Sequence, residues 1–204
     1  MGAKVLHPRS VEVAKIHQVP LCVRSSFDTS KEGTFVVDNE QIEKEYMVTG
    51  VASDANVAKI GIFDIPDQPG IANTIFTALA DAKVNVDMIV QSAMRNNIND
   101  IAFTIPKDDL DTALEIVRGI QAKVGFSDVV YADDVAKISI VGAGMASATG
   151  VAAKMFATLA EAAINLEMIS TSEIKISCII KNQDNNVTKA LQLLHDAFEL
   201  DKLE

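Results

Sequence analysis

The chain has 204 residues, of which 49% are hydrophobic and 23% charged, so it can bury one large core or two small ones. Its 28 acidic residues outnumber 18 basic ones and give a formal net charge of −10, which argues against a nucleic-acid binder because such proteins cluster Lys and Arg. No apolar run reaches the length of a membrane span and no signal peptide is evident, so we expect a cytoplasmic protein without a membrane partner.

The first 46 residues form a small unit of their own. Residues 8–17 begin with a proline and have the apolar spacing of a helix. Residues 19–27 and 34–37 read as short strands, and residues 38–46, "DNEQIEKEY", read as a charged linker. So short a piece is too small to be assigned as an independent domain.

The pattern changes from residue 47 onward. Strands are predicted at 47–53, 57–63, 84–92, 98–105 and 126–132, and helices at 69–83 and 108–123. The side chains expected to face the core are Ile71, Ile75, Leu79 and Ala82 in the first helix and Leu110, Ala113, Leu114 and Val117 in the second. From residue 57 the order is βαββαβ, a ferredoxin-like module with two helices on one face of a sheet.

Residues 135–199 repeat this order, with strands at 135–141, 164–172 and 174–180 and helices at 150–163 and 186–198. Two 20-residue stretches, 70–89 and 150–169, match at nine positions when they are aligned 80 residues apart. Helical periodicity can explain the shared Leu and Ala residues, but it does not explain the pairs Gly70/Gly150 and Asn85/Asn165 as well. We interpret the chain as a duplicated module.

The two copies differ in their number of strands. The second copy lacks a sixth element, whereas a spare strand, 48–53, precedes the first copy. We therefore predict that this strand completes the second sheet, so that the first module is inserted in the second. The fold class is then α+β, with two ferredoxin-like modules that form side-by-side sheets in a dimer. The predicted units are 1–46, then 54–131 as the first module, and 47–53 with 132–204 as the second.

The stretch "DQPGIA", residues 67–72, offers the first candidate site. Pro69 has no N–H to leave unpaired in a first helical turn, and Gly70 allows close approach of the backbone. The N–H groups of Gly70, Ile71 and Ala72 would then face a small anion at the positive end of the helix, with Asp67 available for a ligand ammonium group. A capped turn that only supports helix–sheet packing is the alternative.

The strand after this helix places its side chains alternately on two faces. Val84, Val86, Met88 and Val90 are expected under the helices, with Asn85, Asp87 and Gln91 on the opposite, open face. In the second copy, Asn165, Glu167 and Thr171 take the equivalent places. The repeated asparagines can satisfy the polar ends of a free amino acid, while Asp87 and Glu167 are interpreted as solvent-facing. Ser172 and Glu173, at a hairpin tip, can contact a ligand amine or simply form the turn.

Side chains for catalysis or metal binding do not group in the sequence. Cys22 and Cys178 lack a CxxC partner and are interpreted as buried free thiols, and the three histidines have no metal-ligand spacing. No nucleophile–base set, carboxylate pair or phosphate-binding loop is evident. We expect a binding protein without a metal site.

At the level of motifs, the chain resembles aspartate kinase over essentially its whole length. "KIGIFDIPDQPGIA" and "INLEMISTSEIKISCII" are similar to the paired ACT modules of that family, and "GAKVLHPRSVEVAKIHQVPLCVRSSF" is similar to the end of its kinase domain. The family's nucleotide- and aspartate-binding motifs are absent. The resemblance therefore implies a regulatory (beta) subunit from an internal start at Met1, or part of a longer chain, that is not an enzyme by itself.

The resemblance also implies a function and a set of contacts. A dimer formed through the ACT modules would bind threonine, lysine or both, and would inhibit a catalytic alpha subunit that holds ATP and Mg; this chain would hold no cofactor. A threonine site would use Asp67, Gly70, Ala72, Val84 and Gln91, with Asn165 and Leu166 from a partner chain. A second effector region would include Met145, Ser172 and Glu173.

Two other functions are compatible with the same residues. The chain would be a constitutive assembly subunit if its ACT modules only hold the kinase together without binding an amino acid. It would be a separate enzyme if it phosphorylated aspartate alone, because a fold does not determine a function.

Overall fold

The computed structural model describes residues 5–28, 30–36 and 46–202. The predicted linker, apart from Tyr46, lies outside the described residues, as do the first four residues of the chain.

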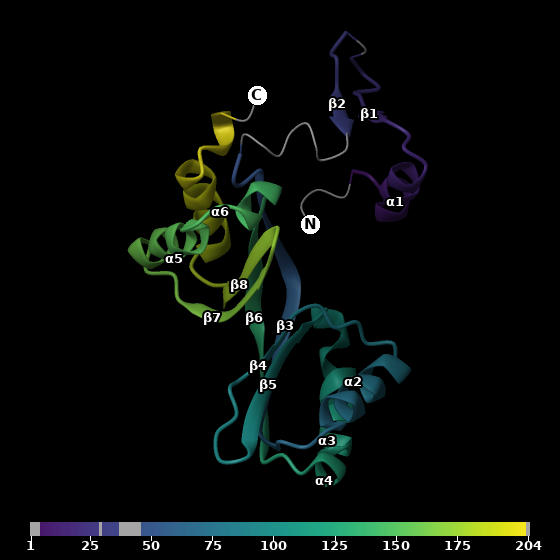
Figure 1. Ribbon diagram of the computed structural model, residues 1–204, viewed down its shortest axis with the longest axis vertical. Coiled ribbons are helices and arrows are strands. Elements are labelled where there is room, and N and C mark those ends of the chain that lie inside the picture. The colour runs from purple at the N-terminus through teal and green to yellow at the C-terminus, as the bar shows by residue number, and fades with distance from the viewer. Residues whose placement is uncertain (1–4, 29, 37–45, 203–204) are drawn as a thin grey trace.

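The N-terminal segment contains one helix and one hairpin, as predicted. The helix α1 (Pro8–Ile16) is followed by β1 (Leu21–Val23) and β2 (Thr34–Val36), which pair antiparallel as a separate two-stranded sheet. In α1 only Ala14 is buried, and Phe27 beyond β1 is fully exposed. Figure 1 shows this segment at the upper right, beside the larger body of the protein. An isolated hairpin needs packing against a further layer to be stable in water, and this one buries little.

The body of the protein is built on one six-stranded sheet in the order β4-β5-β3-β6-β8-β7, antiparallel throughout. Its strands are β3 (Gly50–Pro66), β4 (Ile89–Gln91), β5 (Ile98–Ile105), β6 (Asp128–Val141), β7 (Leu166–Ser172) and β8 (Lys175–Lys181). The strands β3 and β6 run through both halves of the elongated body (Figure 1). Each half therefore has the mixed α and β structure of a ferredoxin-like module, as predicted.

Two predicted strand breaks are absent. The predicted strands 47–53 and 57–63 are joined in β3, and those at 126–132 and 135–141 are joined in β6. Asp54 and Asn56, which flank Ala55, resemble a turn in the sequence, but β3 passes through these residues with register shifts between Asp54 and Lys59. Such irregularities bend a strand without ending it.

The spare strand pairs as predicted. Residues 50–53, at the start of β3, lie opposite 138–141, which are the part of β6 that belongs to the second module. The boundaries 54–131, 47–53 and 132–204 stay a prediction, because strands shared by both modules do not divide at one residue.

The helices agree with the predicted periodicity. They are α2 (Ile71–Asp81), α3 (Leu110–Gly119), α4 (Gln121–Val124), α5 (Val151–Glu161) and α6 (Asn186–Ala197). The predicted inward residues of α3 are all buried, as are Ile75 and Leu79 of α2. Ala82 was wrongly placed inward; it is exposed, because α2 ends before it and Ala82 is the C-cap. Among the helices of the described part of the chain, none is long and apolar enough to cross a membrane.

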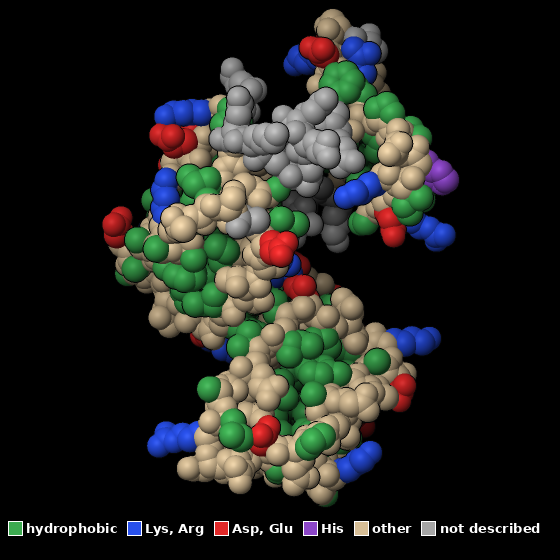
Figure 2. Space-filling model, viewed as in Figure 1, with side chains coloured by type: hydrophobic (Ala, Val, Ile, Leu, Met, Phe, Trp, Pro, Cys, Tyr) green, Lys and Arg blue, Asp and Glu red, His purple; other side chains and the backbone are tan. Residues whose placement is uncertain are grey.

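Each module has its own core, and a third cluster joins them. The first core lies between the sheet and α2 and α3, and the second lies between the sheet and α5 and α6. In Figure 1 the two helix layers lie on opposite sides of the strands, and Figure 2 shows hydrophobic side chains gathered in each half of the visible face. The third cluster, called here the junction cluster, consists of Val57, Met88, Val135, Met168 and Ile179.

The junction cluster corrects the predicted faces of the segment 84–92. Val84 and Val86 pack into the first core as expected, but Met88 belongs to the junction cluster and Val90 packs against it. Only Ile89–Gln91 form a strand, and the backbone N–H of Met88 donates to Thr104 Oγ1 rather than continuing a regular ladder. Side chains alternate between faces only while the pleat is regular, so this irregular stretch carries Met88 to the other face.

Candidate functional site

The start of α2 has an open end. The helix begins at Ile71, so Pro69 precedes it and does not lie in its first turn as predicted. Gly70 is the N-cap with a φ of 94°, and a Cβ atom there would meet nothing within 4 Å. Glycine is therefore required by the left-handed backbone and not by a close neighbour. The side of the turn that a Cβ would occupy is free for a ligand.

Backbone donors are available at this end of the helix. The N–H groups of Gly70 and Ala72 have no acceptor among the described residues, whereas the N–H of Ile71 donates to the Gln68 carbonyl at 3.4 Å. Two of the three predicted donors are thus free. Unpaired N–H groups at the positive end of a helix favour a carboxylate or another small anion.

Asp67 is held beside these donors. Its backbone N–H donates to the Asn97 carbonyl at 2.9 Å, and its Oδ1 accepts from Asn99 Nδ2 at 3.3 Å. The Asp67 carboxylate is exposed, while Asn99 is 5% exposed. A carboxylate next to free N–H groups presents both charges needed to bind the ammonium and carboxylate of a free amino acid.

Gln91 extends the same site from the sheet. It is exposed on β4 and lies opposite Ile101 of β5. Directly paired side chains share a face, and so do residues two apart on a strand, which places Gln91 and Asn99 on one face. This is the face of the first core, to which Ile101 belongs, so the prediction that Gln91 lies on the opposite, open face was wrong. Sequence reasoning missed Asn99. Its signal was a polar residue at an inward position of the apolar strand "INDIAFTI", where Asn is disfavoured.

Within one chain, the remaining predicted effector-site residues do not lie at the start of α2. Val84 and Asn85 follow the C-terminal end of α2, an 11-residue helix about 16 Å long, so they lie at the opposite end from Gly70. The Val84 side chain is buried in the first core. Asn165 is exposed and Leu166 is half-buried at the start of β7, in the other module.

The second predicted effector region is built differently. Met145 is 8% exposed and packs into the second core, so its side chain does not line an open surface. The loop that carries Met145 begins at Gly142 and lies close against Met47. A Cβ on Gly142 would be 2.2 Å from the Met47 carbonyl oxygen. Ser172 and Glu173 are exposed at the hairpin, and Ser172 Oγ donates to the Lys175 carbonyl at 3.4 Å.

Asp87 and Glu167, the two repeated acidic residues, are not simply solvent-facing. Asp87 pairs with Lys137 of the second module's half of β6, and Glu167 pairs with Lys59 of the first module's half of β3. The side chains of Lys59 and Glu167 are 20% and 16% exposed, while that of Asp87 is 40% exposed. Each module thus supplies the acid for the other module's lysine, which a reading of one module alone does not predict.

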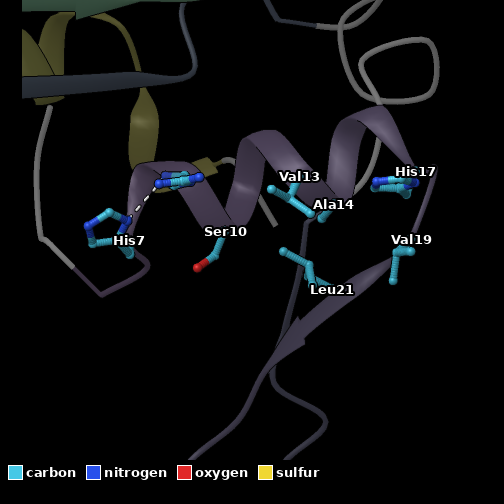
Figure 3. A pocket seen from close by; sticks show the side chains of 8 residues that line it. His7, Ser10, Val13, Ala14, His17, Val19 and Leu21 are labelled. Carbon is cyan, nitrogen blue, oxygen red and sulfur yellow. Dashed lines mark hydrogen bonds between the residues drawn. The ribbon is translucent and has the colours of Figure 1, made fainter.

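A shallow hollow lies away from these residues, in the N-terminal segment. It has a volume of about 570 Å³ and lies between α1 and the start of β1, with Val13, Ala14, Val19 and Leu21 on its apolar wall and His7 and His17 near its ends (Figure 3). None of the predicted effector-site residues lines it.

The cysteines differ from the prediction in one respect. Cys178 is buried in the second core, and burial raises the pKa of its thiol to about 12, but Cys22 is exposed because the hairpin that carries it has no core of its own. Among residues 5–28, 30–36 and 46–202, no group of three or more His, Cys, Asp or Glu side chains is placed to hold a metal ion.

Comparison with known proteins gives a family match and close relatives. The ACT domain model matches residues 64–119 and 138–198. The aspartokinase of Mycolicibacterium smegmatis is 45% identical over 203 residues, which cover 98% of this chain and 48% of that protein. The chain therefore spans about half the length of this curated relative.

Solved structures agree with this match. The regulatory subunit of aspartate kinase from Thermus thermophilus, in a ligand-free form, is 45% identical with a TM-score of 0.69 and covers 74% of this chain and 99% of its own. A structure described as aspartokinase alpha and beta subunits is 46% identical with a TM-score of 0.68, covering 75% of this chain and 99% of its own.

Proposed function

We propose that this chain, which belongs to the ACT-domain family and corresponds to the regulatory region of aspartokinases, binds threonine, lysine or both and transmits feedback inhibition to an aspartate kinase. Such a kinase acts at the start of the synthesis of lysine, threonine and methionine.

The observation that carries the proposal is the open start of α2. Free N–H groups on Gly70 and Ala72 lie three to five residues from an exposed carboxylate on Asp67. A free α-amino acid at neutral pH carries one carboxylate and one ammonium group, so both of its charges find a partner in this short stretch. The side chain of Gln91 adds an amide donor and acceptor from the same module.

A second copy of the chain would complete the site. Leu166 begins β7 and Asn165 precedes it, so both belong to the second module, whereas α2 belongs to the first (Figure 1). Their contribution requires the second module of a partner chain, so we propose a homodimer in which ACT modules of different chains meet. Binding would then favour one arrangement of the dimer, which is what inhibition at a distance requires.

The catalytic step would belong to a partner. The proposed kinase would transfer phosphate from ATP, with Mg, to the side-chain carboxylate of aspartate. We assign none of the residues of this chain to that step. A relative that aligns over 99% of its own chain with 75% of this one comes from a structure of aspartokinase alpha and beta subunits, which supports an alpha subunit as the partner.

Calorimetric titration of the chain with threonine and lysine, separately and together, tests the proposal. We expect saturable binding of at least one of them, and a melting temperature that rises with the logarithm of its concentration. The variant Gln91→Ala is expected to weaken binding, while Thr171→Ala, at the equivalent place in the second module, serves as the matched control.

Absence of binding by threonine, lysine and methionine alike would contradict the sensor function and would favour the constitutive assembly subunit. Phosphorylation of aspartate by the isolated chain would contradict the assignment of catalysis to a partner.

A further inference from the structure

Asn99 has a buried acceptor without a donor. Its side chain lies on β5 opposite Ile65 and is 5% exposed, and its Oδ1 has no hydrogen-bond partner among the described residues. The orientation of the amide is determined by its neighbour, because the Asp67 carboxylate accepts hydrogen bonds and the Asn99 Nδ2 must therefore face it. The oxygen is left as the free group.

A buried polar atom without a partner is uncommon and destabilising, so it requires an explanation. Around Asn99 the wall is apolar, with Ile65 and Ile101 buried on either side. A neutral O–H group can donate to this oxygen without carrying a charge into the apolar wall, whereas an ammonium group cannot. Asn99 contacts Asp67 through Nδ2 and shares a face with Gln91, so its amide, and with it the buried oxygen, lies beside the residues of the amino-acid site.

We propose that Asn99 is a specificity-determining residue of this site, and that its Oδ1 accepts a hydrogen bond from the side-chain hydroxyl of a bound hydroxy amino acid. The inference rests on the proposed function. Asp67 then receives the ammonium group, the N–H groups of Gly70 and Ala72 receive the carboxylate, and Asn99 reads the side chain. The site selects a β-hydroxy amino acid such as threonine over lysine and over an aliphatic amino acid of the same size.

The selection has a physical basis in the hydrogen bond that the hydroxyl gains. The Asn99 oxygen is already buried and unpaired in the free chain, so a ligand hydroxyl that reaches it forms a hydrogen bond without displacing water, whereas an aliphatic ligand gains nothing there. Replacement of Asn99 by an apolar residue removes the hydrogen bond to threonine and leaves the binding of the aliphatic ligand nearly unchanged.

The test compares threonine with 2-aminobutyrate, which has the same carbon skeleton and lacks only the hydroxyl oxygen. Dissociation constants of both are measured by calorimetry for the full chain and for Asn99→Leu, with Asn99→Ala as a second variant and the exposed Asn182→Ala as the control. The wild-type chain is expected to prefer threonine by about tenfold or more. In both Asn99 variants the ratio is expected to fall to about twofold, while Asn182→Ala keeps the wild-type ratio.

Melting curves establish whether each variant is folded. If Asn99→Leu does not fold, the ratio of the two dissociation constants is taken from Asn99→Ala. Equal weakening of both ligands in the variants would overturn the inference, because it would assign Asn99 only to holding Asp67. An unchanged ratio would also overturn it. Wild-type binding of lysine without threonine would overturn the inference while leaving the sensor function in place, and binding of no amino acid at all would overturn both.

Discussion

The two ACT modules share their local structure but differ in what surrounds the same turn. The helices α2 and α5 both have 11 residues, and both begin after a left-handed glycine, Gly70 with a φ of 94° and Gly150 with a φ of 87°. In the first module the turn lies beside Asp67 and the buried amide of Asn99. In the second module the preceding loop is pressed against Met47 and its Met145 fills the core. The duplication preserved the turn, while only the first copy kept a polar site at its opening.

The modules also depend on each other. The acidic residue at equivalent positions, Asp87 and Glu167, pairs in each case with a lysine of the other module. The strands β3 and β6 pass through both modules, and the junction cluster draws side chains from both. Two units that share strands and a core are expected to unfold together.

The largest effect is expected from the two cores. Leu79→Ala in α2 and Leu159→Ala in α5 each remove a side chain that is 0% exposed. Each is expected to lower the free energy of unfolding by about 2–5 kcal/mol, because the lost burial leaves a cavity. Urea denaturation followed by circular dichroism measures the change. Both variants should retain one cooperative transition, and two separate transitions in either variant would show that the modules are independent.

The exchanged ion pairs rank next. Glu167→Gln leaves Lys59, which is 20% exposed, without its carboxylate, and we expect a loss of about 2–3 kcal/mol. Asp87→Asn is expected to cost about 1 kcal/mol, because Asp87 is more exposed and Lys137 still has Asp54 at 3.9 Å.

Chemical denaturation compares these two variants with Glu199→Gln, whose pair with Lys202 lies on the surface and is expected to contribute little. A larger loss of unfolding free energy for Asp87→Asn than for Glu167→Gln would show that burial does not determine which of the two ion pairs stabilises the fold more.

The paired glycines give a comparison in which stability and binding separate. Gly70→Ala and Gly150→Ala both place a Cβ on a left-handed residue in open space, so each is expected to cost about 1–2 kcal/mol. Only Gly70→Ala is expected to weaken amino-acid binding, because its Cβ enters the side of the turn beside Asp67. Thermal denaturation and calorimetric titration of both variants check this, and equal weakening by Gly150→Ala would show that both turns contact the ligand.

The sequence predicted the features that depend on local pattern. The existence and the buried faces of α2 and α5 follow from apolar spacing, although both helices are shorter than the predicted 69–83 and 150–163. The duplication follows from the repeated Gly and Asn residues, which helical periodicity does not require. The pairing of residues 50–53 with the second module followed from counting strands. Each of these inferences needs only neighbouring residues or a comparison of the two copies.

The features that sequence reasoning missed depend on which strands pair and on how the two modules pack against each other. The run Asp54–Asn56 resembles a turn, yet β3 continues through it because β6 pairs alongside. Asp87 and Glu167 look solvent-facing within one module, and their lysine partners appear only when the two modules are placed together. Asn99 is visible in the sequence as a polar residue at an inward position of its strand, but its contact with Asp67 appears only when β3 and β5 are paired.

The smallest effect is expected where the second module has a contact that the first lacks. Lys154 Nζ lies 5.0 Å from the centre of the Phe198 ring, whereas the equivalent residue of the first module, Thr74, donates its hydroxyl to the Gly70 carbonyl at 3.2 Å. A cation over an aromatic face at a partly exposed site contributes about 0.5–1 kcal/mol, so Lys154→Gln should lower stability by about that amount. Phe198→Leu with and without Lys154→Gln completes a double-mutant cycle measured by urea denaturation. Additive losses would mean that the ring and the ammonium group do not interact, and that α5 and the end of α6 are held by apolar packing alone.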